Sequence, residues 1–181
     1  MNSPNTNRRS AARVVALVGI MAATVECGKL ALSFVPNVEI VTLLLALYGY
    51  VFGGAGIVCA IVFVAIEPLI WGFNTWVISY ILYWPFVPVL FMLLGKKGVR
   101  KRFVIAAIAG LSTFFFGVLS ALVEVGLFSG YFDNFLYRLG VYYARGVVFY
   151  VIHVCSNIVI FAFLFPYLKN KLTRIKYKIF S

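Results

Sequence analysis

Acidic and metal-binding residues are scarce in this chain, which has five Asp and Glu, one His and three Cys among 181 residues. A single histidine excludes a histidine-rich metal site. Cys27, Cys59 and Cys155 lie within apolar runs at no metal-binding spacing, and their odd number argues against a disulfide framework. We therefore predict no bound metal and no intrinsic cofactor.

The motifs of several enzyme classes are missing as well. No G-x-x-x-x-G-K-[ST] loop occurs, so the glycine-rich stretch 53–56 is no phosphate cradle and the chain does not hydrolyse ATP itself. The sequence contains neither H-E-x-x-H nor G-x-S-x-G, which argues against zinc proteases and serine hydrolases. We predict that the protein is not an enzyme, and only a carboxylate mechanism within the membrane stays open.

Charged residues of either sign make up 12% of the chain, whereas 64% is hydrophobic and the mean hydropathy is +1.02. A helical bundle surrounded by lipid needs that much apolar sequence, and a soluble domain of this size does not. The apolar runs are continuous rather than alternating, which favours helices over strands. We predict one all-α membrane domain over residues 1–181, with six spans at about 14–35, 38–52, 57–73, 76–94, 103–126 and 146–168.

The basic residues lie at the ends of the predicted spans. Thirteen of the 16 Lys and Arg fall in 1–13, 95–102 and 169–181, which six spans place on one side of the membrane. The positive-inside rule makes that side cytoplasmic, together with both termini. A single tilted helix over the second and third segments is the alternative, but it would turn two of these clusters outward. The bases form no groove or motif for nucleic acid, so we expect lipid to surround the protein and no nucleic-acid partner.

The acidic residues gather near one face of the predicted bundle, in or beside apolar segments. They are Glu26, Glu39, Glu67, Glu124 and Asp133. A carboxylate that faces hydrocarbon costs a few kcal/mol or more, so such residues usually line a cavity or a polar path. We expect a cavity that opens outward and captures an external solute.

Other polar and aromatic residues complete this candidate site. In the last span, Arg145, Phe149, His153 and Asn157 recur every four residues and share one helix face. The candidate ligand-binding residues are Asn37, Glu39, Glu67, Trp71, Tyr80, Tyr83, Trp84, Glu124, Arg145, His153 and Asn157. Glu26 and Lys29 form either a structural ion pair or part of the pocket. The tryptophans are alternatively interface anchors, and His153 is alternatively a hydrogen-bonded core residue.

Two further segments allow two interpretations each. A long outer loop near 127–145, rich in Tyr and Phe, is either an interfacial belt or a lid over a ligand. Ala12, Ala16, Gly19 and Ala23 form a small-residue stripe on the first helix. Small residues at this spacing let another helix approach closely, either within the bundle or as a docking face for a separate subunit.

One stretch resembles a known family. Residues 36–44, PNVEIVTLL, followed by YGYVFG at 48–53, resemble the end of helix one and helix two of S components. These are the substrate-binding membrane subunits of energy-coupling factor (ECF) vitamin transporters, which are ABC importers. The resemblance extends over the whole chain in size, six spans, basic cytoplasmic ends and an alanine-rich first helix.

Membership would imply a multi-pass protein of the bacterial cell membrane that binds one vitamin from outside, with the loops 1–2, 3–4 and 5–6 near the pocket. Its partners would be a transmembrane coupling subunit, docked on the small-residue face of helix one, and two cytoplasmic ATPases that use ATP. Cobalamin or cobinamide is the first candidate ligand, and riboflavin, pantothenate, folate, thiamine or a queuosine precursor are alternatives.

Two other functions remain open from the residues alone. The first is a standalone proton-coupled carrier, in which Glu26, Glu67 or His153 relays protons. The second is an intramembrane enzyme or a scaffold for another complex.

Overall fold

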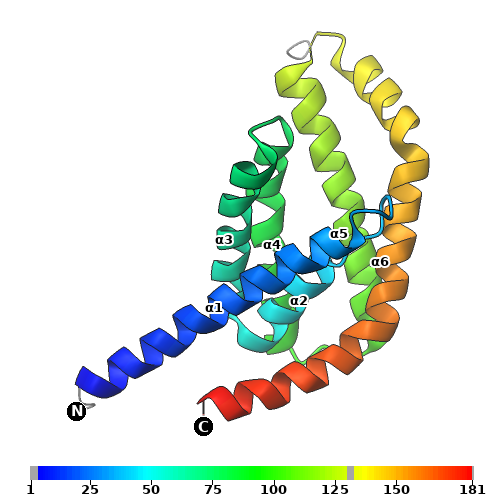
Figure 1. The fold of residues 1–181 in the computed structure, drawn as a ribbon. Coiled ribbons are helices and arrows are strands. Elements are labelled where there is room, and N and C mark those ends of the chain that lie inside the picture. The colour runs from blue at the N-terminus through cyan, green and yellow to red at the C-terminus, as the bar shows by residue number, and fades with distance from the viewer. Residues whose placement is uncertain (1–3, 130–132, 181) are drawn as a thin grey trace.

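The computed structural model describes residues 4–129 and 133–180, and these ranges contain helices and no strand. The elements are α1 (Pro4–Leu32), α2 (Val41–Phe52), α3 (Gly54–Trp71), α4 (Trp76–Lys96), α5 (Arg102–Val123), the π-helix η1 (Glu124–Phe128) and α6 (Phe135–Phe180). The prediction of an all-α architecture is confirmed for this part of the chain (Figure 1).

Five of the described helical stretches are long and apolar enough to cross a membrane. They are Ala11–Leu32, Gly54–Trp71, Trp76–Lys96, Arg102–Phe128 and Phe135–Phe180. These are the features of a multi-pass membrane protein. The apolar helix α2 has 12 residues. It is about 18 Å long, whereas the hydrocarbon layer is about 30 Å thick. The count of six spans therefore stays a prediction.

Helix α2 lies at the centre of the bundle. Its residues from Val41 to Gly49 are all buried, and α1, α3, α4 and α6 contact it. A helix that is enclosed on every side needs no polar face, which explains its uniformly apolar sequence. Two glycines permit the closest approaches: a Cβ on Gly49 would lie 2.2 Å from the carbonyl oxygen of Pro88, and one on Gly56 would lie 2.5 Å from the backbone of Tyr48.

The connection between α1 and α2 lies against the middle of α6 rather than at the far end of the bundle (Figure 1). The Ser156 hydroxyl of α6 donates a hydrogen bond to the Asn37 carbonyl oxygen over 3.1 Å. We predicted this connection at the outer surface. It instead lies beside the middle of α6, with residues 33–36 exposed, because the short helix α2 does not extend to the level at which α6 begins.

The predicted loop over 127–145 is wrong for most of its length. Residues 124–128 form the π-helix η1 and α6 already begins at Phe135, while the predicted loop aromatics Tyr131 and Phe132 lie outside the described residues. Asn134 has a positive φ of 46° just before the helix, a conformation that asparagine adopts more readily than most residues. No proline follows until Pro166, so nothing in 135–145 interrupts a helix. Helix α6 also continues past the predicted end at 168.

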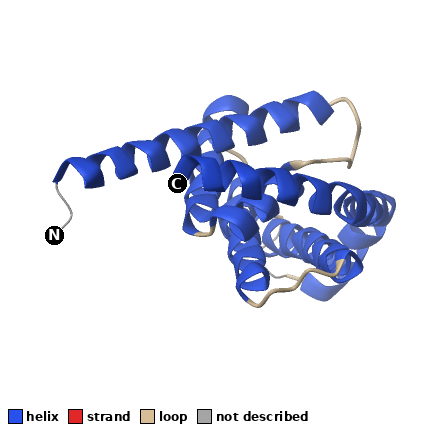
Figure 2. Cartoon of the chain, turned by 90° about the horizontal axis from the view of Figure 1, so that it is seen from below, coloured by secondary structure: helices blue, strands red, loops and turns tan. Residues whose placement is uncertain are grey.

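The two chain ends lie on the same side of the molecule. Figures 1 and 2 both show the end of α6 on the same side as the first half of α1, whose first turns extend beyond it. The Arg13 guanidinium donates a hydrogen bond to the Ile179 carbonyl oxygen over 3.2 Å. This arrangement gathers the basic segments at the two ends of the chain at one end of the bundle.

Candidate functional site

A hydrogen-bonded polar cluster lies where the α1–α2 connection meets α5 and α6. The Asn157 amide nitrogen donates to Glu39 Oε1 over 2.7 Å and to Thr113 Oγ1 over 3.0 Å. His153 Nε2 lies 3.5 Å from the same oxygen of Glu39. The other oxygen, Oε2, accepts a 2.8 Å hydrogen bond from the backbone N–H of Thr42 in the first turn of α2. The Glu39 carboxylate is therefore held from three directions.

This cluster lies deeper than the sequence indicated. Thr113 is eleven residues beyond Arg102, the first residue of α5, which corresponds to about 16 Å along the helix. Its partners Asn157 and Glu39 lie at the same level. We predicted Glu39 at the outer start of the second span, whereas the structure places it near the middle of α5. The position of the α1–α2 connection beside the middle of α6 explains the difference.

A second polar cluster joins α1 to α3. Lys29 forms an ion pair with Glu67, whose side chain is only 1% exposed. The Lys29 ammonium also lies 5.1 Å from the ring centre of Trp71, 5.7 Å from that of Tyr80 and 6.0 Å from that of Phe63. Aromatic faces attract a cation at this distance, so the ammonium is held by one carboxylate and three rings.

Of the two interpretations of Glu26 and Lys29, the ion pair is not formed. Lys29 pairs instead with Glu67 on α3. Glu26 is 9% exposed, and neither of its carboxylate oxygens has a hydrogen-bond partner among the described residues. Glu67 Oε1 is also unpaired. Buried acceptors of this kind require a proton, water or a ligand.

A cavity of about 350 Å³ connects the two clusters. Its lining consists of Lys29, Leu32, Ser33, Val35, Pro36, Asn37, Val38, Glu39 and Trp71. One basic and one acidic side chain therefore face the same space, and each is held by buried partners from its own cluster. The volume and the few fixed polar groups are typical of small-molecule sites.

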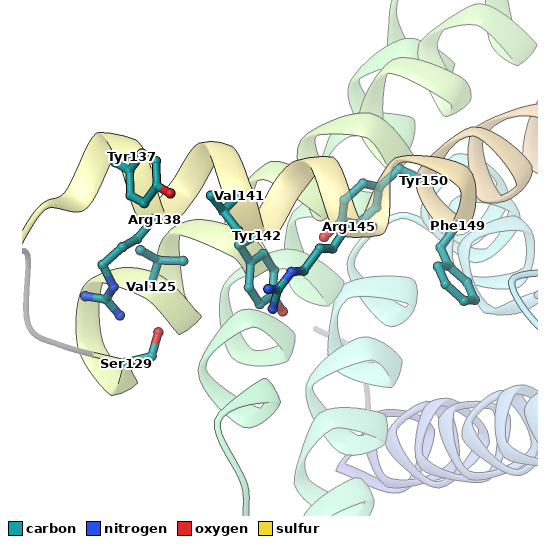
Figure 3. A pocket seen from close by; sticks show the side chains of 10 residues that line it. Val125, Ser129, Tyr137, Arg138, Val141, Tyr142, Arg145, Phe149 and Tyr150 are labelled. Carbon is teal, nitrogen blue, oxygen red and sulfur yellow. The ribbon is translucent and has the colours of Figure 1, made fainter.

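A larger cavity of about 730 Å³ lies between η1 and the first half of α6 (Figure 3). It is lined by Val125, Ser129, Tyr137, Arg138, Val141, Tyr142, Arg145, Gly146, Phe149 and Tyr150. The four residues of the predicted stripe on α6 therefore belong to two different sites. Arg145 and Phe149 line this cavity, whereas His153 and Asn157 bind the Glu39 carboxylate.

Three predicted site residues line neither cavity and belong to neither polar cluster. Tyr83 is buried and its hydroxyl lies 3.2 Å from Ser112 Oγ. Trp84 is also buried and packs edge-on against Phe63, with ring centres 5.9 Å apart. Glu124 begins η1, where its carbonyl oxygen accepts hydrogen bonds from Ser129. Tyr83 and Trp84 therefore belong to the packed interior.

Sequence reasoning did not select several residues of the larger cavity, among them Arg138, Tyr142 and Tyr150. We predicted a loop over 127–145, and in a loop the sequence spacing of residues does not indicate which of them share a face. Arg138 and Arg145 are seven residues apart, which places both on one face of a helix. This seven-residue spacing is the feature of the sequence from which the pair could have been predicted.

The small-residue stripe of α1 faces outward. Ala12, Ala16, Gly19 and Ala23 are all exposed, and a Cβ added to Gly19 would meet no described atom within 4 Å. The opposite side of α1 packs into the bundle. The interpretation of the stripe as internal packing is therefore wrong for the described part of the chain.

Searches against protein-family models, curated proteins and solved structures found no match. The fold and composition define the chain as an α-helical, multi-pass membrane protein.

Proposed function

We propose that the protein is the substrate-binding membrane subunit, or S component, of an ECF-type importer in a bacterial cell membrane. It captures a vitamin or related micronutrient from outside, and a separate coupling module delivers it inward. The observation that carries this proposal is the 350 Å³ cavity between the two polar clusters. Both Lys29 and Glu39 line this cavity.

Fixed charges beside a cavity within apolar helices are costly unless they serve a purpose. Each charge near the hydrocarbon costs at least a few kcal/mol. A simple packing role would be met more cheaply by apolar residues, as replacements of buried ion pairs often demonstrate. A ligand with polar groups of both signs would instead use the Lys29 and Glu39 side chains directly.

The partners follow from two features of the chain. The sequence contains no nucleotide-binding loop, so ATP hydrolysis is assigned to two cytoplasmic ATPase subunits. The exposed stripe from Ala12 to Ala23 provides a face on which a helix of a transmembrane coupling subunit packs closely. In this proposal the chain has six spans, with α2 as the second, and the basic ends are cytoplasmic.

Cobalamin or cobinamide is the first candidate ligand, and riboflavin, pantothenate, folate, thiamine and a queuosine precursor are the alternatives. The test is mass spectrometry of the small molecule that the protein carries when purified from its own cells in mild detergent. We expect a vitamin-like compound, together with co-purifying ATPase subunits. A preparation with neither would contradict the proposal.

A proton-coupled carrier is the second candidate function. The buried carboxylate oxygens of Glu26 and Glu67 that have no partner among the described residues favour it, because carboxylates within membrane helices often belong to proton relays. It predicts that vesicles containing this protein alone accumulate the solute when a pH gradient is imposed. The S component requires the ATPase subunits and shows no such uptake.

A further inference from the structure

The larger cavity lies between η1 and the first half of α6, and the charged side chains that line it are all basic. Its lining includes the two guanidinium groups of Arg138 and Arg145 and no acidic side chain. The side chains of Arg138, Tyr142, Arg145 and Phe149 project from the same side of α6 (Figure 3). The two arginines are two helical turns apart, about 10 Å along the axis.

Both guanidinium groups have N–H donors that bind no acceptor among the described residues. Arg138 donates to the carbonyl oxygen of Asp133 over 3.2 Å, which occupies one of its five N–H groups. Arg145 forms no hydrogen bond, ion pair or ring contact with any described residue. A guanidinium presents its donors in a planar fork that matches the oxygens of a carboxylate or phosphate. Glu124 at the start of η1 lies near Tyr142 but forms no ion pair with either arginine, so the Arg145 guanidinium is free to bind an oxyanion.

Four aromatic side chains form a large part of the remaining wall, and two glycines make room for one of them, Tyr150. Tyr150 stacks on Tyr143, with ring centres 4.6 Å apart and planes inclined by 27°. A Cβ on Gly146 would lie 2.7 Å from the Tyr150 ring, and one on Gly117 would lie 2.9 Å from it. The ring occupies its place because both neighbours lack a side chain. Tyr142 and Phe149 line the same cavity and add further ring surface.

We propose that this cavity binds an oxyanion, a carboxylate or phosphate, that is attached to a flat ring system. The guanidinium of Arg145 binds the oxyanion, and the ring system packs against the tyrosine and phenylalanine rings. The proposal goes beyond the proposed function, whose ligand site is the 350 Å³ cavity, and places a second ligand site in the same chain. The binding itself requires no coupling module.

A phospholipid headgroup offers the same phosphate chemistry from a different source. It contains no flat ring, so the aromatic wall would contribute nothing to its binding. The two sources are therefore distinguished by a ring-bearing phosphate and a ring-free one, and by the lipid that surrounds the protein.

The experiment uses the full-length protein in phosphatidylcholine nanodiscs, stripped of co-purified ligand, and calorimetric titration with phenyl phosphate or inorganic phosphate. We expect phenyl phosphate to bind at least about tenfold more tightly than inorganic phosphate, and Arg145→Gln to weaken it by about tenfold or more. The matched control is Arg174→Gln, which removes a guanidinium from a separate basic cavity beside Tyr50 and Lys169. It should leave the affinity unchanged.

Gly146→Ala provides a second variant, because its methyl group displaces the Tyr150 ring. It should weaken phenyl phosphate and leave inorganic phosphate unaffected. Equal affinity for both phosphates, loss of phenyl phosphate binding in phosphatidylglycerol nanodiscs, or sensitivity to Arg174→Gln in place of Arg145→Gln would overturn the proposal. The first two would identify a headgroup site and the third would place binding at the other cavity.

The failure of this inference is separable from that of the proposed function. If ATPase subunits co-purify but phenyl phosphate binding is independent of Arg145, the oxyanion site is wrong and the importer subunit stands. If phenyl phosphate binds as expected but no coupling subunits are found, the site stands and the importer proposal fails.

Discussion

The single residues of the two polar clusters differ in how completely they are paired. Glu39 accepts hydrogen bonds from Asn157 and the Thr42 backbone, and Asn157 is fully buried. Glu26, in contrast, is buried beside an ion pair that it does not join. Two carboxylates and one ammonium therefore share the space between α1 and α3. We expect the unpaired carboxylate of Glu26 to destabilise the folded state, whereas the paired carboxylate of Glu67 stabilises it.

This difference predicts opposite effects of two identical substitutions. Glu67→Gln removes the partner of Lys29, whose side chain is only partly buried at 25% exposure, so it should cost about 1–3 kcal/mol of unfolding free energy. Glu26→Gln removes a repulsive charge and an unpaired carboxylate, so it should be neutral or stabilise the fold by about 1 kcal/mol. Equilibrium unfolding of the purified protein in mixed detergent micelles measures both. Equal destabilisation by the two variants would mean that Glu26, too, is needed for an attractive contact.

The residues of the candidate site were only partly predictable from the sequence. The every-four spacing of Arg145, Phe149, His153 and Asn157 correctly put them on one face of a helix, because that pattern is local. The partner of Lys29 was not predictable in this way. It lies 38 residues away on another helix, and only the packing of α1 against α3 brings the two together.

The helices themselves follow from hydrophobicity wherever they are exposed to lipid. The apolar runs of α3, α4 and α5 lie close to their predicted limits, since a helix that faces lipid is a long apolar segment in any sequence. Helix α2 is equally apolar for a different reason, namely enclosure by its neighbours. Hydropathy does not separate these two cases, which is why a span over 38–52 was predicted and a 12-residue central helix is observed.

The close approach of α2 and α4 depends on Gly49. A Cβ there would lie 2.2 Å from the Pro88 carbonyl oxygen and 2.5 Å from its Cα, and backbone atoms do not rotate away as a side chain does. We therefore expect Gly49→Ala to destabilise the protein by at least about 1–3 kcal/mol, measured as detergent unfolding.

Gly19→Ala on α1 is the matched control for that substitution. No described atom lies within 4 Å of its added Cβ, and alanine favours a helix by about 1 kcal/mol over glycine. This variant should be neutral or slightly more stable. If Gly49→Ala behaves like Gly19→Ala, the two helices are further apart than the structure places them.

At the scale of the whole molecule, the candidate ligand site and the candidate docking face lie in different places. The polar clusters and their cavity lie inside the bundle, while the small-residue stripe of α1 lies outside it. Because they are on different sides of α1, capture of a solute and docking of a partner can be disturbed separately. Composition alone placed the chain in a membrane and gathered its bases at the span ends. It did not reveal this separation, which depends on the rotation of α1 about its axis.

Ala16→Phe tests the separation directly. The aromatic ring would project from the exposed face and hold a partner helix away, so ATP-dependent uptake by the assembled importer should fall at least tenfold while ligand binding by the isolated subunit is unchanged. The matched control is Val15→Phe. Val15 is 72% exposed, but it precedes Ala16 by one residue and therefore points about 100° away from it. Transport by this variant should be retained. Uptake that survives Ala16→Phe, or that is lost equally in both variants, would show that α1 does not dock through its small residues.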